Sequence, residues 1–251
     1  MPVCLNGYPL KALLPYFDWD DLYRRWDLAG GVNAGRENAR AVLRRDAENL
    51  LERIVSENLI ELRGVVRFMP ALSHNEDIML YETGEPDGSA APRLYARFTF
   101  PRSTRYRAGS PNPCLADFIL PEEESRGRFD TLGLFALSAG FWTNAPSVDA
   151  ETAAKTAQKP GDYNAILAAS LADSLAEAWS AETHSRLAGS GIRPAFGYPC
   201  CPNHGDKRLA FKLLNAEKLC ALSLTETAMI SPAASVCGMY FLNPKSFYFT
   251  A

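Results

Sequence analysis

A proline- and glycine-rich loop, residues 191–204, carries the most distinctive combination of residue types in the sequence. It contains three prolines and two glycines among fourteen residues, which disfavours regular helix or strand and turns backbone N–H and C=O groups outward. A planar polar ligand such as adenine could pair with those groups, and the fork of Arg193 suits a carboxylate or a phosphate. The composition also fits a plain connector whose arginine caps the preceding helix, and composition by itself favours the connector.

Two carboxylates and a histidine share one face of a predicted helix over residues 163–187. Asp173, Glu177 and His184 are spaced by four and seven residues, so at about 100° per residue they fall within roughly 40° of one another. The two carboxylates could hold a cation, either an ammonium or a sulfonium. Helical geometry alone favours an ordinary solvent-facing surface over a binding site.

The cysteines offer a third kind of chemistry. Cys200, Cys201 and His204 could supply three metal ligands, but a closed zinc site needs about four, and the other histidines are His74 and His184. The six cysteines are typical of free thiols in a reducing compartment. We therefore predict no metal site, and a metal or thiol protein is kept as an alternative.

The hydrophobic pattern predicts the elements that position these groups. Amphipathic spacing predicts helices over residues 18–28, 37–59, 163–187 and 206–219. In the third helix, the buried face is predicted from residues that recur every four positions: Leu167, Leu171, Leu175 and Trp179. β-rich runs predict strands over residues 63–69, 77–81, 94–100, 115–120, 131–138, 222–225, 235–241 and 247–250. Because helices and strands come in runs rather than in strict alternation, the predicted fold class is α+β.

The overall composition argues against several classes of function. The 251 residues carry 26 basic and 29 acidic side chains, a net charge of −3, which provides no field for phosphate groups and argues against a nucleic-acid partner. No apolar run approaches the about 18 residues that span a membrane. No secretory leader is visible, so we expect a cytoplasmic protein. Gly189-Ser190-Gly191 follows a helix and lacks a third glycine, which disfavours a Rossmann cofactor site.

Taken together, these segments resemble a known module. Residues 193–204, Arg-Pro-Ala-Phe-Gly-Tyr-Pro-Cys-Cys-Pro-Asn-His, resemble the Arg-x-x-x-Gly-Tyr-Pro…Cys-Pro-x-His signature of the activation domain of cobalamin-dependent methionine synthase. Asp18-Trp19, residues 171–178 and residues 232–236 resemble further segments of that family, in the same order. The similarity extends from about residue 13 to residue 251, so it does not depend on one short motif.

The resemblance implies a single domain over residues 1–251, with a twisted, largely antiparallel β-sheet flanked by helices. It also implies S-adenosylmethionine (AdoMet) as the ligand, bound in a shallow surface groove. In the family, AdoMet methylates cob(II)alamin after a one-electron reduction by flavodoxin or a flavoprotein reductase, which rescues oxidised cobalamin. No Asp-x-His-x-x-Gly corrinoid motif occurs here. The cobalamin is therefore expected on a partner domain or protein of the methionine synthase system, contacted in trans by a free-standing or split-off module.

For the amino-acid end of AdoMet, the resemblance implies three contacts. Asp18 would bind the amino group, Arg193 would bind the carboxylate, and Glu177 would lie near the positively charged sulfur. These roles agree with the chemistry of the residues themselves, since carboxylates attract ammonium and sulfonium groups and a guanidinium binds a carboxylate.

For the adenosine end of AdoMet, the resemblance implies contacts with backbone groups and an aromatic wall of the groove. Ala195 and Tyr198 would offer backbone groups to the adenosine, and Tyr248 and Phe249 would form a wall of the groove. The methyl acceptor belongs to the partner, so no catalytic residue is predicted in this chain. Its expected contribution to the reaction is the positioning of the methyl donor.

One departure from the family lies next to the predicted site. The family usually has an aromatic-containing stretch between the long helix and the arginine, whereas here only residues 185–192 join them. Two hypotheses follow: a reactivation module that presents AdoMet for reductive methylation, or a non-catalytic module that caps or chaperones a corrinoid protein. The presence of Asp18, Glu177 and Arg193 together favours the first.

Overall fold

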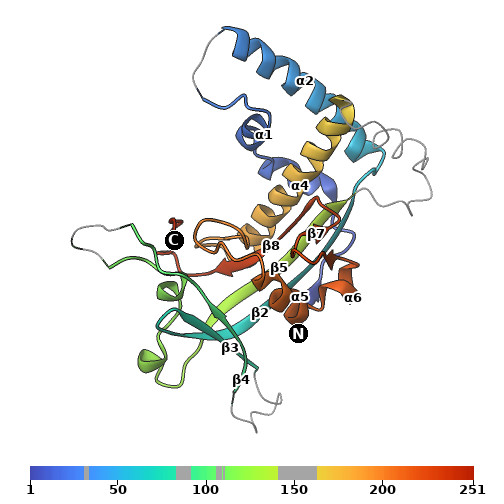
Figure 1. Ribbon diagram of the computed structural model, residues 1–251. Helices are drawn as coiled ribbons and strands as arrows, with labels where there is room; N and C mark the ends of the chain where they lie inside the picture. Colours follow the sequence, from blue (N-terminus) through green and yellow to red (C-terminus); the bar gives the residue numbers. More distant parts are fainter. Residues whose placement is uncertain (31–33, 83–91, 106–108, 110, 141–162) are drawn as a thin grey trace.

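The computed structural model describes residues 1–30, 34–82, 92–105, 109, 111–140 and 163–251. At its centre is an antiparallel sheet whose strands lie in the order β4-β3-β2-β5-β8 (Figure 1), with the short β1 also paired to β2. Its strands are β1 (Val3–Cys4), β2 (Glu61–His74), β3 (Asp77–Glu82), β4 (Arg93–Thr99), β5 (Asp130–Gly140) and β8 (Ser235–Phe241). A separate two-stranded ribbon consists of β6 (Ser223–Leu224) and β7 (Ile230–Ser231).

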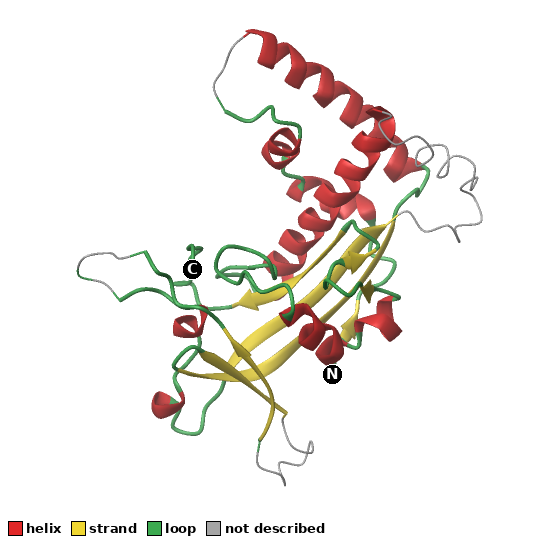
Figure 2. Ribbon diagram, viewed as in Figure 1, coloured by secondary structure: helices red, strands yellow, loops and turns green. Residues whose placement is uncertain are grey.

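Helices cover both faces of this sheet (Figure 2). Against one face lies α4 (Tyr163–Leu187), and η1 (Leu10–Tyr16), α1 (Trp19–Arg25) and α2 (Ala34–Ser56) pack on α4. On the other face lie α5 (Asp206–Leu214) and α6 (Ala216–Cys220). The antiparallel sheet with flanking helices confirms the predicted α+β class.

The four-residue spacing predicted for α4 is confirmed as a buried stripe. Leu167, Leu171, Leu175 and Trp179 are each at most 1% exposed. The helix packs on β5 and β8, and Gly64 on β2 leaves room for the Trp179 ring, which an added Cβ would overlap. No helix in the described ranges, α4 included, is long and apolar enough to cross a membrane.

The predicted strand over residues 115–120 is wrong. Leu115–Phe118 form a short 3-10 helix, η2. A side chain of this segment forms a hydrogen bond with the backbone at the start of the helix, and such local hydrogen bonds compete with strand pairing. The Asp117 carboxylate accepts a hydrogen bond from the N–H of Cys114 at 2.8 Å. Arg102 holds the same carboxylate with two hydrogen bonds at 2.8 and 3.0 Å.

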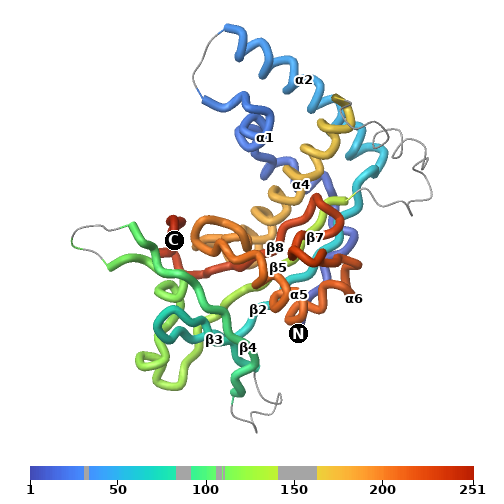
Figure 3. Tube along the Cα trace, viewed as in Figure 1, coloured from blue at the N-terminus to red at the C-terminus, as the bar shows by residue number. Residues whose placement is uncertain are grey.

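The predicted terminal strand over residues 247–250 is also wrong. The edge of β8 to which it could add is already taken by the loop after α4, which forms bridges to Gly238 and Phe241. The terminal segment instead runs beside that loop (Figure 3), where the N–H of Ala251 donates to the carbonyl of Pro199 at 3.0 Å.

Two other predicted elements differ in extent. The helix predicted over residues 206–219 is divided into α5 and α6 at Asn215, whose φ of 54° lies in the left-handed region. The strand predicted over residues 63–69 continues through Pro70 to the end of β2. The proline is tolerated because β3 pairs with β2 only from Ala71 onward, so Pro70 stands outside that ladder.

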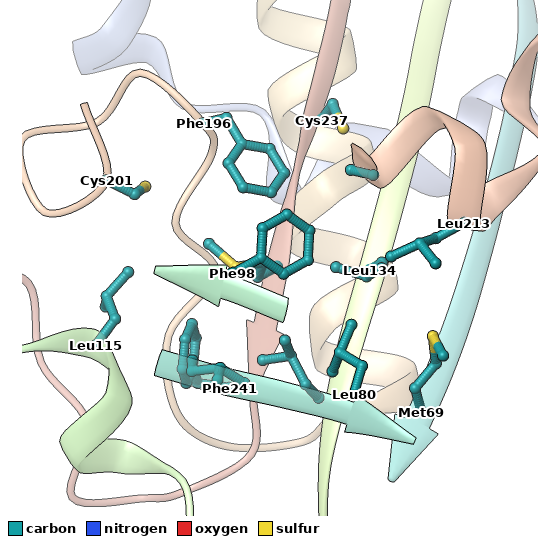
Figure 4. Close-up of a cluster of buried hydrophobic side chains, with 14 of the residues drawn as sticks. Met69, Leu80, Phe98, Leu115, Leu134, Phe196, Cys201, Leu213, Cys237 and Phe241 are labelled. Carbon is teal, nitrogen blue, oxygen red and sulfur yellow. The ribbon is translucent and has the colours of Figure 1, made fainter. Parts of the chain in front are cut away.

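β5 is buried on both faces, which explains its continuous apolar sequence. Leu134 and Ala136 belong to the cluster under α5, whereas Phe135 and Leu137 belong to the cluster under α4, as the alternation of side chains along a strand requires. The α5-side cluster also takes in Phe196 of the loop after α4 (Figure 4). The core of the sheet therefore anchors the loop that carries the candidate chemistry.

Candidate functional site

The loop after α4 lies along the outer edge of β8. The N–H of Phe196 donates to the carbonyl of Cys237, and the N–H of Met239 donates to the carbonyl of Pro194, both at 3.0 Å. Gly238 is required for this close approach, because an added Cβ would overlap the carbonyl oxygen of Pro194. The sheet thus fixes the path of a segment that has no regular structure of its own.

Arg193 points from this loop onto the body of α4. Its Nη1 donates to Glu177 Oε2 and to Ser180 Oγ, each at 3.2 Å. Its backbone N–H donates to the hydroxyl of Tyr248 at 3.1 Å. The hydroxyl of Tyr198 lies 3.5 Å from Glu177 Oε1. Arg193 therefore does not cap the end of α4. Its side chain joins the loop to the middle of that helix.

Asp18 is held at the start of α1 as its N-cap. Its Oδ1 accepts hydrogen bonds from the backbone N–H groups of Asp20 and Asp21 at 2.9 and 3.1 Å, the usual role of aspartate at a helix start. Its Oδ2 lies 3.4 Å from Arg24 Nη2. The cap orients the carboxylate, and 58% of the side chain remains exposed.

Arg25 links α1 to α4. Its Nε donates to Asp21 Oδ2 at 2.7 Å, and its Nη1 lies 3.4 Å from Asp173 Oδ2. Burial raises the pKa of Asp173, and the positive charge of Arg25 opposes that shift. Asp173 and Glu177 do share one face of α4, as predicted. Each of the two carboxylates faces an arginine, Arg25 and Arg193 respectively.

A groove lies between η1, α1, α4 and the loop. The groove has a volume of about 370 Å³ and is lined by Tyr16, Asp18, Asp21, Arg24, Arg25, Glu177, Ala178, Arg193 and Tyr198. Three carboxylates and three guanidinium groups therefore face one small space. Such a lining is complementary to a zwitterion, a molecule that carries an ammonium and a carboxylate close together.

Two comparisons with known proteins match this chain. The family model for "Vitamin B12 dependent methionine synthase, activation domain" matches residues 9–190 and 188–251. The chain belongs to this family. A solved structure described as the MetH reactivation domain bound to AdoHcy is 31% identical, with a TM-score of 0.82, over 100% of this chain and 81% of that chain. The fold and the family resemblance derived from the sequence are thereby confirmed.

The two matched segments of this activation domain meet at residues 188–190. That point lies between the end of α4 and Arg193, where the sequence predicted a connection shorter than that of the family. Here the N–H of Gly189 donates to the carbonyl of His184 at 2.9 Å. The short turn brings the chain from the helix to the arginine within a few residues.

Of the four residues predicted for the adenosine end, Tyr198 lines the groove, whereas Ala195, Tyr248 and Phe249 are outside its lining. Tyr248 contacts the ring of Tyr198, with ring centroids 6.3 Å apart. Ala195 is buried, and its carbonyl accepts a hydrogen bond from the N–H of Tyr198 at 2.9 Å. The ring of Phe249 packs against Phe118 at a centroid distance of 6.3 Å. Phe249 therefore contributes to packing in this structure, and its role as a wall of the ligand groove stays a prediction.

The two tyrosines beside the groove stay neutral. Burial raises the pKa of Tyr198, and the negative charge of Glu177 raises it further. Burial likewise raises the pKa of Tyr248, partly offset by the N–H of Arg193. Both hydroxyls are therefore available as hydrogen-bond donors at neutral pH.

Five lining residues of the groove were missed by sequence reasoning: Tyr16, Asp21, Arg24, Arg25 and Ala178. A signal for three of them exists in the sequence. Asp21 precedes Arg24 and Arg25 by three and four residues, a spacing at which opposite charges meet on a helix. Nothing in that spacing indicates that the same charges face α4.

The candidate metal ligands are used in other ways. Cys200 and Cys201 are buried residues of the loop itself. The Cys201 thiol donates to the carbonyl of Ala195 at 3.1 Å. His204 Nδ1 lies 2.8 Å from the ammonium of Lys207. Within the ranges that the structure describes, no group of three or more His, Cys, Asp or Glu side chains could hold a metal ion.

Proposed function

We propose that this activation domain, residues 1–251, binds AdoMet in the groove and presents its methyl group to oxidised cobalamin on a partner. The observation that carries the proposal is the juxtaposition of carboxylates and guanidinium groups around one space of about 370 Å³. The ligand has the matching charges, an ammonium and a carboxylate on one carbon and a sulfonium nearby. The solved reactivation domain that is bound to AdoHcy, the product of methyl transfer from AdoMet, supports the choice.

Each charged part of AdoMet has a partner in the groove. Asp18 is exposed and oriented by its capping role, so its outer oxygen can accept from the amino group. Arg193 directs one nitrogen to Glu177 and Ser180, and the rest of its fork can bind the carboxylate. Glu177 then lies beside the arginine, where it attracts the sulfonium.

The chain contributes positioning and not acid–base chemistry. The partner corrinoid protein holds the methyl acceptor, and flavodoxin or a flavoprotein reductase supplies one electron to cob(II)alamin. AdoMet supplies the methyl group and leaves as AdoHcy. The fixed loop and α4 hold the donor in one orientation. Part of the entropy that methyl transfer would otherwise lose is therefore already lost when AdoMet binds. We place this activity in the cytoplasm, with the other components of the methionine synthase system.

The test is a calorimetric titration of the purified protein with AdoMet, beside Arg193→Ala. Loss of a hydrogen-bonded charge contact costs about 1.5–3 kcal/mol, roughly 10- to 150-fold in affinity. Wild-type binding that weakens to that extent supports the proposal. If neither heat nor a thermal shift develops at millimolar AdoMet, the chain does not serve as the methyl-donor module.

The second candidate function is a non-catalytic cap for a corrinoid protein. It is favoured by the short connection that the sequence predicts over residues 185–192, within which the two family matches meet. This function predicts a complex with the partner corrinoid protein that forms without AdoMet and is unchanged by Arg193→Ala. Co-sedimentation of the two proteins, with and without AdoMet, distinguishes it from the first.

A further inference from the structure

One face of α4 contacts the Arg193 loop at successive turns of the helix. Glu177 Oε2 and Ser180 Oγ each lie 3.2 Å from Arg193 Nη1. One turn further along, His184 Nε2 lies 3.1 Å from the carbonyl oxygen of Ser190. These contacts hold the short segment between the helix and the arginine.

Ser180 is an unexpected residue for its place in the helix. It is fully buried, serine is a weaker helix former than alanine, and a buried hydroxyl without a partner is destabilising. The hydroxyl is tolerated because it accepts the hydrogen bond from Arg193. The carbonyl of Ser180 accepts a further hydrogen bond from the hydroxyl of Tyr240 at 3.3 Å, so its backbone is also tied to the sheet.

We propose that Ser180 is a positioning residue for the carboxylate of the ligand and acts only through Arg193; the inference rests on the proposed function. With Glu177 alone, the guanidinium would pivot about a single contact. A second acceptor on the same nitrogen fixes the plane of the guanidinium, so its remaining N–H groups keep one orientation toward the groove. Preorganisation of this kind increases affinity because less freedom is lost on binding.

The connection between the end of α4 at Leu187 and Arg193 is short, which makes this contact important. Residues 188–190, where the two family matches meet, are followed almost at once by Arg193. The hydroxyl of Ser190 donates to the carbonyl of Leu242 at 2.9 Å, which holds the turn but leaves the arginine side chain unconstrained. The face of α4 then determines where the guanidinium lies.

The test titrates wild type and Ser180→Ala with two ligands. One is AdoMet, and the other is decarboxylated AdoMet, which keeps the adenosine and the sulfonium but lacks the carboxylate. We expect Ser180→Ala to weaken AdoMet binding roughly 3- to 10-fold, the range of one typical hydrogen bond, and to leave decarboxylated AdoMet within about twofold of wild type. In an Arg193→Ala background the same substitution has no further effect, because the two residues act as one unit.

Ser174→Ala is the matched control. Ser174 is also buried in α4, and its hydroxyl has no hydrogen-bond partner among the described residues. The control is expected to leave both titrations unchanged. Alanine favours the helix at either position, so neither variant should lose stability through its helix propensity. A lower Tm in thermal unfolding would therefore reveal a folding defect, whereas weaker AdoMet binding at an unchanged Tm indicates a loss of positioning.

Two results overturn the inference. Equal weakening for both ligands means that Ser180 supports the groove in general, and unchanged AdoMet binding means that Arg193 needs no second acceptor. In both cases the proposed function stands. Wild-type protein that binds no AdoMet overturns the proposed function and this inference together, so the wild-type titration distinguishes the two failures.

Discussion

Glu177 Oε2 and Arg193 Nη1 lie 3.2 Å apart, with about a quarter of each side chain exposed. The pair joins the middle of α4 to an irregular loop 16 residues further along the chain. It places a negative and a positive group side by side at the wall of the groove. This single contact therefore fixes the positions of a carboxylate and a guanidinium group relative to each other at that wall.

Glu177→Gln is expected to reduce the preference for AdoMet over AdoHcy. The glutamine keeps the shape of the side chain but removes its attraction for the sulfonium, which AdoHcy lacks. At a partly exposed site that attraction contributes about 1 kcal/mol, roughly fivefold in affinity. Loss of the pair with Arg193 affects both ligands alike, so the ratio of their affinities is the informative quantity. An unchanged ratio in calorimetric titrations would place the sulfonium away from Glu177.

Arg24→Gln is expected to tighten AdoMet binding. Arg24 Nη2 lies 3.4 Å from Asp18 Oδ2, and both side chains are more than half exposed, so the arginine competes with the amino group of the ligand. Exposed ion pairs contribute about 0.2–1 kcal/mol, which predicts a gain of up to about fivefold. Arg45→Gln removes the same charge from an exposed pair with Asp46 on α2 and is the control. Weaker binding by Arg24→Gln alone would instead make Arg24 a ligand contact.

Gly191→Ala is expected to disrupt the groove, whereas Gly189→Ala is mild. Both glycines have positive φ, 90° and 73°, a conformation that costs an alanine about 1 kcal/mol or more. At Gly191 an added Cβ would also overlap the carbonyl oxygen of Phe241, whereas nothing lies near it at Gly189. Urea unfolding should therefore show a loss of about 3 kcal/mol or more for the first and about 1 kcal/mol for the second. Equal losses contradict the packing of the turn against β8.

Stability is expected to fall as the pH drops below about 6.5, because of His184. Burial lowers the pKa of this histidine, the carbonyl of Ser190 opposes the shift, and the charge of Arg193 adds to it. The unfolded chain then binds the proton on His184 more readily than the folded chain. The contribution of His184 to the free energy of unfolding is therefore complete above its pKa in the unfolded chain, and it is lost as the pH falls toward its pKa in the folded chain. His184→Gln is expected to flatten the dependence of Tm on pH between about 5 and 7. His74→Gln, on an exposed histidine of β2, serves as the control that keeps the wild-type profile.

Features that depend on neighbours along the chain could be predicted from the amino-acid sequence. The period of Leu167, Leu171, Leu175 and Trp179 predicted the buried face of α4, because helical geometry alone brings these residues together. Prolines and glycines predicted the irregular loop, because each of them disfavours regular helix or strand at its own position. The motif around Arg193, together with the other matching segments in the same order along the chain, indicated the family, which the comparisons confirmed.

The charges that meet in the groove and the segments that pair with the sheet depend on the packing of the whole fold. Arg24 and Arg25 face the groove because α1 packs on α4, a contact between segments far apart in the sequence. Residues 247–250 have the composition of a strand but form none, because the loop after α4 occupies the edge of β8. Local patterns cannot specify such outcomes, since they depend on competition between distant segments for one edge or one face.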